Sequence, residues 1–262
     1  IHFDFISAFL GWGLIFTRTF VMMMLTPFLG GRGVPGRIRL VLGIVLATFI
    51  FFLMGDDFVN QVPEDKGLLI ALFFKEIFFG LVLGLATIMC FYAIDAGGRI
   101  VDNQRGSANA QIFVPQLGQV SIFGLFQFWL GLSFFLFMSG HTIFLKAFME
   151  SFVSVPVFSL PQIAPGVSPF LELIIRMSSD VLILGMQLAA PVLIAIFLTD
   201  IVLGIANKMA PQIHVFEIGF MIKGYAGVAM VYISILVLVT QMDVFFDIMN
   251  GNVKKVIELF AR

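Results

Sequence analysis

Long apolar segments separated by short polar segments are the dominant pattern of this sequence. A helix needs about 20 residues to cross the hydrocarbon core of a bilayer, and several apolar runs approach or exceed this length. They cover residues 5–29, 38–54, 67–94, 121–144, 181–199 and 224–242. The pattern predicts an all-α, membrane-type fold of roughly five to seven long helices arranged as helical hairpins. Composition agrees, since 12% of the residues are charged, against roughly 25% in soluble domains.

A proline-rich stretch between residues 150 and 172 divides the chain into two parts. Proline in a helix interior removes a backbone hydrogen bond and clashes with the preceding turn, so we expect a connector here rather than a helix. The prolines are Pro156, Pro161, Pro165 and Pro169. The first helical part is therefore predicted at residues 1–160. The second, at residues 161–262, is predicted to be one helical hairpin followed by an amphipathic C-terminal tail from residue 243.

Several ionisable residues lie inside the apolar runs. They are Arg18, Lys75, Glu76, Asp180 and Asp200. Such a group at a membrane helix centre costs about 2.5–3.5 kcal/mol on insertion scales, so each is expected to face protein or water. Lys75 and Glu76 are adjacent and point about 100° apart around a helix, which predicts a separate partner for each. Their helix is then packed on at least two sides, including, as a hypothesis, by helices of other subunits. Alternatively, one or both lie near a helix end and extend to water.

Other residues in the apolar runs favour packing over chemistry. Gly80 and Gly84 have the spacing that lets two helix backbones approach closely. The three methionines at residues 22–24 point around a helix, which favours core filling over a metal site. Cys90 is the single cysteine, so it cannot form an internal disulfide and is interpreted as a small core residue.

The sequence contains no motif for catalysis, cofactor binding or metal binding. A phosphate-binding loop, H-E-x-x-H, G-x-S-x-G and a cysteine pair are all absent. His2, His141 and His214 are far apart and lack the spacing of metal ligands. The net charge of −1 argues against nucleic acid as a partner. We therefore expect a protein that is not an enzyme and that holds no cofactor or metal.

A polar block at residues 95–107 lies between two apolar runs and carries Asp95, Arg99, Asp102 and Arg105. Charged groups at the end of a membrane-grade helix require either a solvated turn or the lining of a water-filled path. Residues 105–119 combine small residues with helix breakers and one phenylalanine, a composition typical of a loop with few apolar anchors. Such a loop can leave its position at modest cost. An ordinary connector between two helices is the alternative reading.

Two blocks of the sequence, considered together, resemble the FliR/SctT family of type III secretion export-gate subunits. The first is Ala-Gly-Gly-Arg-Ile-Val-Asp-Asn-Gln-Arg-Gly at residues 96–106, and the second comprises residues 210–216 followed by Met-Ile-Lys-Gly at residues 221–224. Supporting blocks lie at Arg18 with residues 27–30, at residues 75–80, and at residues 191–204. The Asp-Asn-Gln-Arg-Gly form is more similar to the injectisome (SctT) branch than to the flagellar branch.

The resemblance implies a subunit that joins FliP/SctR-type and FliQ/SctS-type subunits in a closed spiral around an export channel. It implies a FliP-like first part and a FliQ-like second part. A FlhB/SctU-type switch protein, unfolded secreted proteins in transit and inner membrane lipid are further expected partners. The implied location is the bacterial inner membrane, with much of the chain held above the membrane plane in the secretion basal body.

The resemblance also implies roles for particular residues. The loop at about residues 105–119 would plug the channel, and Phe113 and its neighbours would seal the resting pore against ions. The expected plug residues are Arg105, Gly106, Ser107, Asn109, Gln111, Phe113, Pro115 and Gln116. The charges expected at subunit interfaces are Arg18, Lys75, Glu76, Asp200 and Lys223.

A function from another class remains open at this point. In an ion-coupled membrane transporter or channel, Asp95, Asp180 and Asp200 would be substrate or proton sites near interrupted helices. A transporter is expected to be stable alone as a monomer or dimer, whereas an export-gate subunit is expected to require its partner proteins. A membrane enzyme is a third class, for which the sequence offers no motif.

Overall fold

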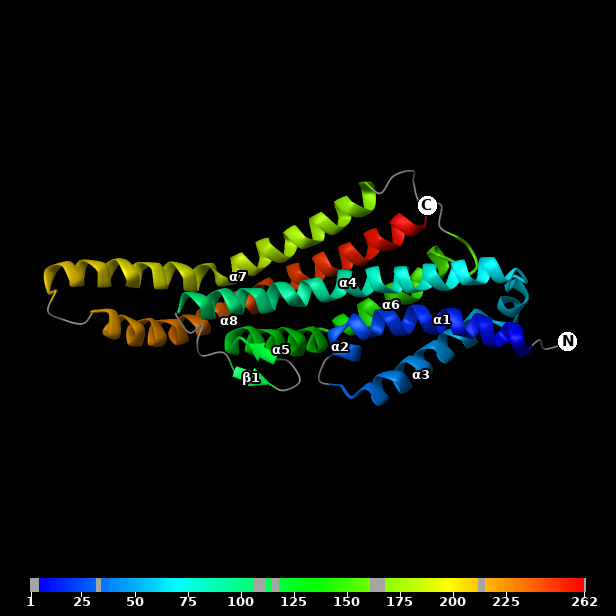
Figure 1. Cartoon of the computed structure of the whole chain (residues 1–262), viewed down its shortest axis with the longest axis horizontal. Coiled ribbons are helices and arrows are strands. Elements are labelled where there is room, and N and C mark those ends of the chain that lie inside the picture. The colour runs from blue at the N-terminus through cyan, green and yellow to red at the C-terminus, as the bar shows by residue number, and fades with distance from the viewer. Residues whose placement is uncertain are drawn as a thin grey trace. The chain divides into compact units, whose positions relative to one another are not determined.

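Helices account for almost all of the regular structure in the computed structural model of this chain, which describes residues 5–31, 34–105, 112–114, 118–160, 168–211 and 215–261 (Figure 1). The α-helices are α1 (Phe5–Leu25), α2 (Pro27–Gly30), α3 (Gly36–Met54), α4 (Lys66–Gln104), α5 (Ile122–Phe137), α6 (Gly140–Ser154), α7 (Ser168–Met209) and α8 (Val215–Phe260). A 3₁₀-helix, η1 (Asp56–Gln61), follows α3, and strands β1 (Ile112–Val114) and β2 (Gly118–Val120) lie between α4 and α5. The prediction of an all-α, membrane-type protein is confirmed.

Within the described residues, five helices are long and apolar enough to cross a membrane, judged by length and composition: α1, α3, α4, α7 and α8. Helices α5 and α6 meet at a bend of 73° and would form a sixth span if they make one broken crossing. The sequence predicted one helix here. The break lies at Ser139, whose backbone is left-handed with φ of 58°, directly before Gly140.

Three helices are longer than the apolar runs that predicted them. Helix α4 continues through the first part of the polar block to Gln104, so a solvated turn at residues 95–104 is wrong. Helix α7 begins at Ser168 with Pro169 in its first turn, where proline is tolerated because that N–H has no helical acceptor. The connector is therefore shorter than predicted. The tail from residue 243 is the continuation of α8.

The chain forms two compact units, each assembled from separate stretches of sequence. Unit 1 comprises Ile1–Met89, Ser139–Met177 and Ile248–Arg262, and unit 2 comprises Cys90–Met138 and Ser178–Asp247. Helices α4, α7 and α8 contribute to both units. The units therefore interleave residues of the two sequential parts, 1–160 and 161–262.

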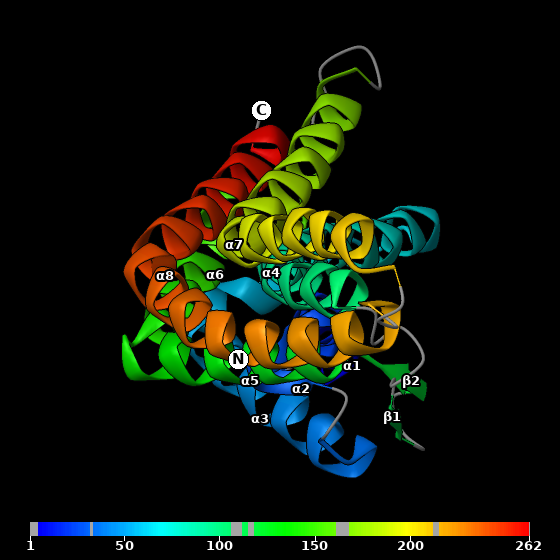
Figure 2. The same ribbon diagram turned by 90° about the vertical axis from the view of Figure 1, so that its left-hand side faces the viewer.

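Unit 1 packs α1 against α3, against the first half of α4 and against α6. Helices α1 and α3 lie side by side (Figures 1 and 2), and the Trp12 indole of α1 donates a hydrogen bond of 3.1 Å to Thr48 of α3. The predicted close approach at Gly80 is confirmed, because a Cβ there would lie 2.7 Å from the Arg18 carbonyl oxygen of α1. A Cβ at Gly84 would lie 2.7 Å from Leu25 Cβ. Backbone-to-backbone packing therefore fixes α4 on α1.

Two methionines and two pairs of phenylalanine rings also pack inside unit 1. Met22 and Met23 are fully buried, which confirms core filling for these two residues. Phe79 of α4 packs on Phe260 of α8 with ring centroids 4.9 Å apart. Phe78 packs in the same way on Phe170 of α7 at 5.3 Å. These aromatic contacts hold the start of α7 and the end of α8 against α4.

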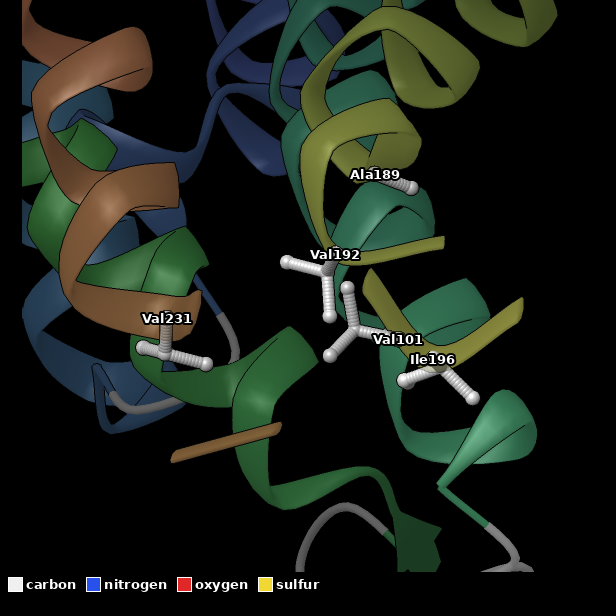
Figure 3. Packing of buried hydrophobic residues seen from close by; sticks show 5 residues of the cluster. All are labelled: Val101, Ala189, Val192, Ile196 and Val231. Carbon is white, nitrogen blue, oxygen red and sulfur yellow. The ribbon is translucent and has the colours of Figure 1, made fainter. Parts of the chain in front are cut away.

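Unit 2 packs the end of α4 against α5, α7 and α8. Its described apolar cluster contains Val101 of α4, Ala189, Val192 and Ile196 of α7, and Val231 of α8 (Figure 3). The Cys90 thiol is buried and donates to the Phe245 carbonyl oxygen, which confirms its interpretation as a core residue. Strands β1 and β2 form a two-stranded antiparallel ribbon, labelled in Figure 2, in which Phe113 pairs with Gln119.

Candidate functional site

A buried charge network lies at the centre of unit 1. The Arg18 guanidinium of α1 forms a two-point ion pair with the Glu76 carboxylate of α4, through Nε to Oε2 and through Nη2 to Oε1 at 2.9 Å. Lys75 Nζ lies 2.7 Å from the same Oε1. Arg18 and Glu76 have no exposed side-chain surface. The Arg18 guanidinium also stacks over the rings of Phe79 and Phe152, at 4.7 Å and 4.4 Å.

Two cations and one anion leave this network with a net positive charge, which backbone carbonyl groups compensate. Arg18 donates to the carbonyl oxygens of Ser151 and Val155 at the end of α6. Lys75 Nζ donates to three further carbonyl oxygens, those of Pro156, Val157 and Ser159, at 2.8–3.1 Å. Carbonyl groups at the C-terminal end of a helix carry partial negative charge; the Ser151 carbonyl also accepts the Val155 backbone N–H, and the three acceptors of Lys75 lie directly after α6. Their position explains how a net positive cluster is stable inside the unit.

The network differs from the prediction in one respect. Lys75 and Glu76 have separate partners as expected, three backbone carbonyl groups for Lys75 and Arg18 for Glu76, but they also contact one another, which was not expected. Arg18, Lys75 and Glu76 find all the contacts described above within their own chain, and an interface with another subunit is not needed to explain them.

The end of α4 forms a second polar site, in unit 2. Asp95 and Arg99, one turn apart on α4, form an ion pair of 2.7 Å, a spacing that supports helix formation. One turn further, Asp102 is 6% exposed, and its Oδ2 accepts the Ser121 hydroxyl and the Phe123 backbone N–H. Ser121 in turn caps α5 by accepting the Gly124 N–H at 2.9 Å. The carboxylate therefore joins α4 to the start of α5.

Arg105 follows α4 and packs against α5 and α8. Its Nη1 lies 3.5 Å from Asp102 Oδ1, and its guanidinium carbon lies 4.5 Å from the centroid of the Phe123 ring. The side chain crosses α8 at Gly227, where a Cβ would lie 2.3 Å from Arg105 Cδ. Arg105 Nε is buried without a hydrogen-bond partner. The position of this arginine therefore depends on a glycine of α8.

Two consecutive glycines let α4 fit between α5 and α7. A Cβ on Gly98 would lie 2.5 Å from the backbone nitrogen of Gly124 in α5. A Cβ on Gly97 would lie 3.1 Å from the Gly185 carbonyl oxygen in α7. Because adjacent helix positions point about 100° apart, each glycine admits a different neighbour. Gly-Gly in the polar block is therefore a packing feature.

Two of the predicted plug residues, Arg105 and Phe113, belong to the described residues. Arg105 is described above, and Phe113 lies in β1, so residues 112–114 of the predicted plug are paired with residues 118–120 rather than irregular. The remaining predicted plug residues, Gly106, Ser107, Asn109, Gln111, Pro115 and Gln116, lie outside the described residues. The structure places Arg105 and the ribbon in unit 2, and Arg18 with Lys75 and Glu76 in unit 1.

Asp200 of α7 and Lys223 of α8 form an ion pair in unit 2. The Asp200 side chain is 45% exposed and the Lys223 side chain 25% exposed. Unlike the network of unit 1, this pair is open to solvent or to another chain. Among the described residues, no group of three or more His, Cys, Asp or Glu side chains is placed to hold a metal ion.

Sequence reasoning missed Ser121, Phe123 and Gly227 as neighbours of the polar block. Ser121 carried a usable signal, since serine directly before an apolar run is a typical helix N-cap. No local sequence signal points to the contacts of Phe123 and Gly227, because these contacts depend on how α4, α5 and α8 pack.

Comparison with known proteins gives a consistent result along most of the chain. A family model described as bacterial export proteins, family 1, matches residues 9–249. The chain is 30% identical to the flagellar biosynthetic protein FliR of Bacillus subtilis (strain 168) over 258 residues, 97% of this chain and 93% of that protein. It is 31% identical to the Yop proteins translocation protein T of Yersinia pestis over 214 residues, 80% of each chain. It is 28% identical to the surface presentation of antigens protein SpaR of Shigella sonnei over 224 residues, 84% of this chain and 82% of that protein.

Proposed function

Because the chain belongs to family 1 of the bacterial export proteins, we propose that it closes a spiral of FliP/SctR-type and FliQ/SctS-type subunits around a protein export channel. Membership confirms the resemblance to the FliR/SctT family, and the chain is an inner-membrane component of a type III secretion or flagellar export apparatus. Flagellar and injectisome relatives match at nearly equal identity. The injectisome branch is proposed on the sequence of residues 102–106.

The observation that carries the proposal is an apolar surface too long for one bilayer. Helix α7 has 42 residues, with Pro191 inside it, and is about 63 Å long when measured along the helix path at 1.5 Å per residue, whereas the hydrocarbon core is about 30 Å thick. Its exposed apolar side chains extend from Leu171 near its start to Met209 at its end. Between them lie exposed Ile175, Leu182, Ile183, Met186, Ile194, Phe197, Leu198, Ile201, Val202 and Ile205. A hydrocarbon core of this thickness corresponds to about half of the helix path, which supports neighbouring subunits as the cover of the remainder and a location partly above the membrane plane.

In this proposal the first part, residues 1–160, is FliP-like and the second part, residues 161–262, is FliQ-like. The segment at residues 105–119, here called the plug segment, closes the resting channel. Unfolded secreted proteins pass when the segment is displaced, and a FlhB/SctU-type switch protein is a further partner. The ribbon of β1 and β2 supports a compact closing element, because paired strands hold a short segment together.

Co-expression with the two partner types tests the assembly. The chain is expected to co-purify with FliP/SctR-type and FliQ/SctS-type subunits as one complex of defined mass in native mass spectrometry. Expressed alone, it is expected to aggregate, because the apolar surface of α7 then lacks its cover. A monodisperse monomer or dimer that is stable without partners would favour an ion-coupled transporter instead.

Deletion of residues 107–118 tests the plug segment. The assembled complex is expected to leak ions in the resting state, while its subunit composition stays unchanged. Conductance of purified complexes in a planar bilayer measures the leak. Conductance equal to that of the intact complex would reject the plug role.

Replacement of Lys223 by Ala tests the interface role proposed for Lys223 and Asp200. An exposed ion pair within one chain contributes about 0–1 kcal/mol, so loss of an internal pair alone should leave assembly almost unchanged. We expect instead a several-fold reduction in the amount of FliQ/SctS-type subunit that co-purifies. Lys254→Ala, at an exposed position of the same helix, is the matched control. Equal assembly of the two variants would argue against the interface role.

A further inference from the structure

One carboxylate joins the two ends of the plug segment. Asp102 lies on the last turn of α4, three residues before the segment starts. Ser121 lies two residues after the segment ends. The Ser121 hydroxyl and the Phe123 backbone N–H, at 3.0 Å, both donate to the same oxygen of Asp102, Oδ2. Hydrogen bonds to an ionised acceptor shielded from water are among the stronger ones in proteins.

The same contacts complete the start of α5. The first backbone N–H groups of a helix have no helical acceptor, and here Phe123 N–H donates to Asp102 while Gly124 N–H donates to Ser121 at 2.9 Å. A carboxylate at a helix N-terminus is also favoured by the helix dipole. Asp102 therefore stabilises α5 and ties it to α4 through a single group.

Arg105 supports this arrangement from the opposite side of the carboxylate. It lies near Asp102 Oδ1, stacks over the Phe123 ring and crosses α8 at Gly227. Residues before and after the plug segment are thus held together by groups outside the ribbon. Within the segment, the antiparallel pairing of β1 and β2 joins residues 112–114 to residues 118–120.

We propose that Asp102 is a positioning residue of the plug segment. Its hydrogen bonds to Ser121 and Phe123, here called the clasp, hold the two ends of the segment together, and the resting seal against ions depends on this clasp. The inference rests on the proposed plug function. It implies that the end of α4 and the start of α5 stay joined when the channel opens. The resting seal then depends on Asp102 and Ser121, and neither residue needs to line the channel.

Conductance of the assembled complex in a planar bilayer tests the clasp, with potassium chloride as the permeant salt. Asp102→Ala removes the shared acceptor, and we expect a rise in resting conductance of about tenfold, the fold-change that corresponds to loss of about one charge-assisted hydrogen bond. Asp102→Asn keeps an acceptor oxygen but loses the charge, so it should give a smaller rise than Asp102→Ala. Ser121→Ala removes one of the two donors and should give an intermediate rise.

A combined variant separates positioning from general destabilisation. In the complex that lacks residues 107–118, Asp102→Ala should add no further conductance, because there is no segment left to position. An added effect in that background would overturn the clasp, since independent defects add. Leak from the deletion without leak from Asp102→Ala would also overturn it, while the plug function would stand. Absence of leak from the deletion would reject both.

Discussion

Replacement of Glu76 by Ala is expected to prevent stable folding of the chain. Glu76 is the one anion of the buried network, so its removal leaves Arg18 and Lys75 as uncompensated positive charges in unit 1. Breaking a buried ion pair by removing one partner costs about 3–5 kcal/mol, a large fraction of the roughly 5–15 kcal/mol that stabilises a typical domain. The effect should be larger than that of any exposed substitution in this chain.

The amount of protein in the membrane and the midpoint of thermal unfolding of the purified complex measure this effect. Glu64→Ala is the matched control, because Glu64 is exposed in the turn before α4 and loses the same group. The control should accumulate like the unaltered chain. If Glu76→Ala accumulated and unfolded like Glu64→Ala, the network would not be a stabilising element.

Replacement of Gly98 by Ala is expected to have the second largest effect. The new Cβ would lie within 2.6 Å of backbone atoms of Phe123 and Gly124. Backbone atoms cannot rotate away as a side chain can, so α4 and α5 must separate. Overpacking of this kind costs about 1–3 kcal/mol, and here it would also disturb the contacts of Asp102 with the start of α5.

A lower thermal midpoint of the complex, together with increased resting conductance, is the expected outcome for Gly98→Ala. Gly204→Ala is the control. A Cβ at Gly204 meets nothing within 4 Å, and alanine is favoured over glycine in a helix by up to about 1 kcal/mol, so the control should be neutral or slightly stabilised. Equal midpoints for the two variants would contradict the tight packing of α4 on α5.

The buried network shows where three charges of the apolar runs find partners within the chain. From the sequence, a charged side chain in an apolar run indicates a partner but does not identify it. The expectation that Arg18, Lys75 and Glu76 lie at subunit interfaces came partly from the adjacency of Lys75 and Glu76 and partly from the resemblance to a multi-subunit gate. Their partners in unit 1 are each other and the carbonyl groups at the end of α6. Asp200 and Lys223, which are partly exposed, are the pair for which an interface role is still proposed.

The amino-acid sequence by itself determined the class of the protein, its family and most of its helices. Apolar runs of helix-spanning length predict helices because the backbone must be internally hydrogen-bonded wherever water is excluded. The close approach at Gly80 was also predictable, since glycine spacing along a helix is a local property. The sequence placed the polar block next to a segment of low helix preference, and the ribbon lies in that segment.

Only the tertiary structure decided which groups meet. Glu76 lies 58 residues from Arg18, and the Val155 carbonyl that Arg18 also contacts lies 137 residues away. The contact of Asp102 with the start of α5 and the crossing of Arg105 over Gly227 likewise depend on packing between helices. Helix ends were misjudged for the same reason: charges at the end of α4 are stable in a helix once ion pairs and a neighbouring helix N-terminus compensate them. Local pattern fixes where a backbone can be helical, whereas charge compensation depends on distances between residues far apart in the chain.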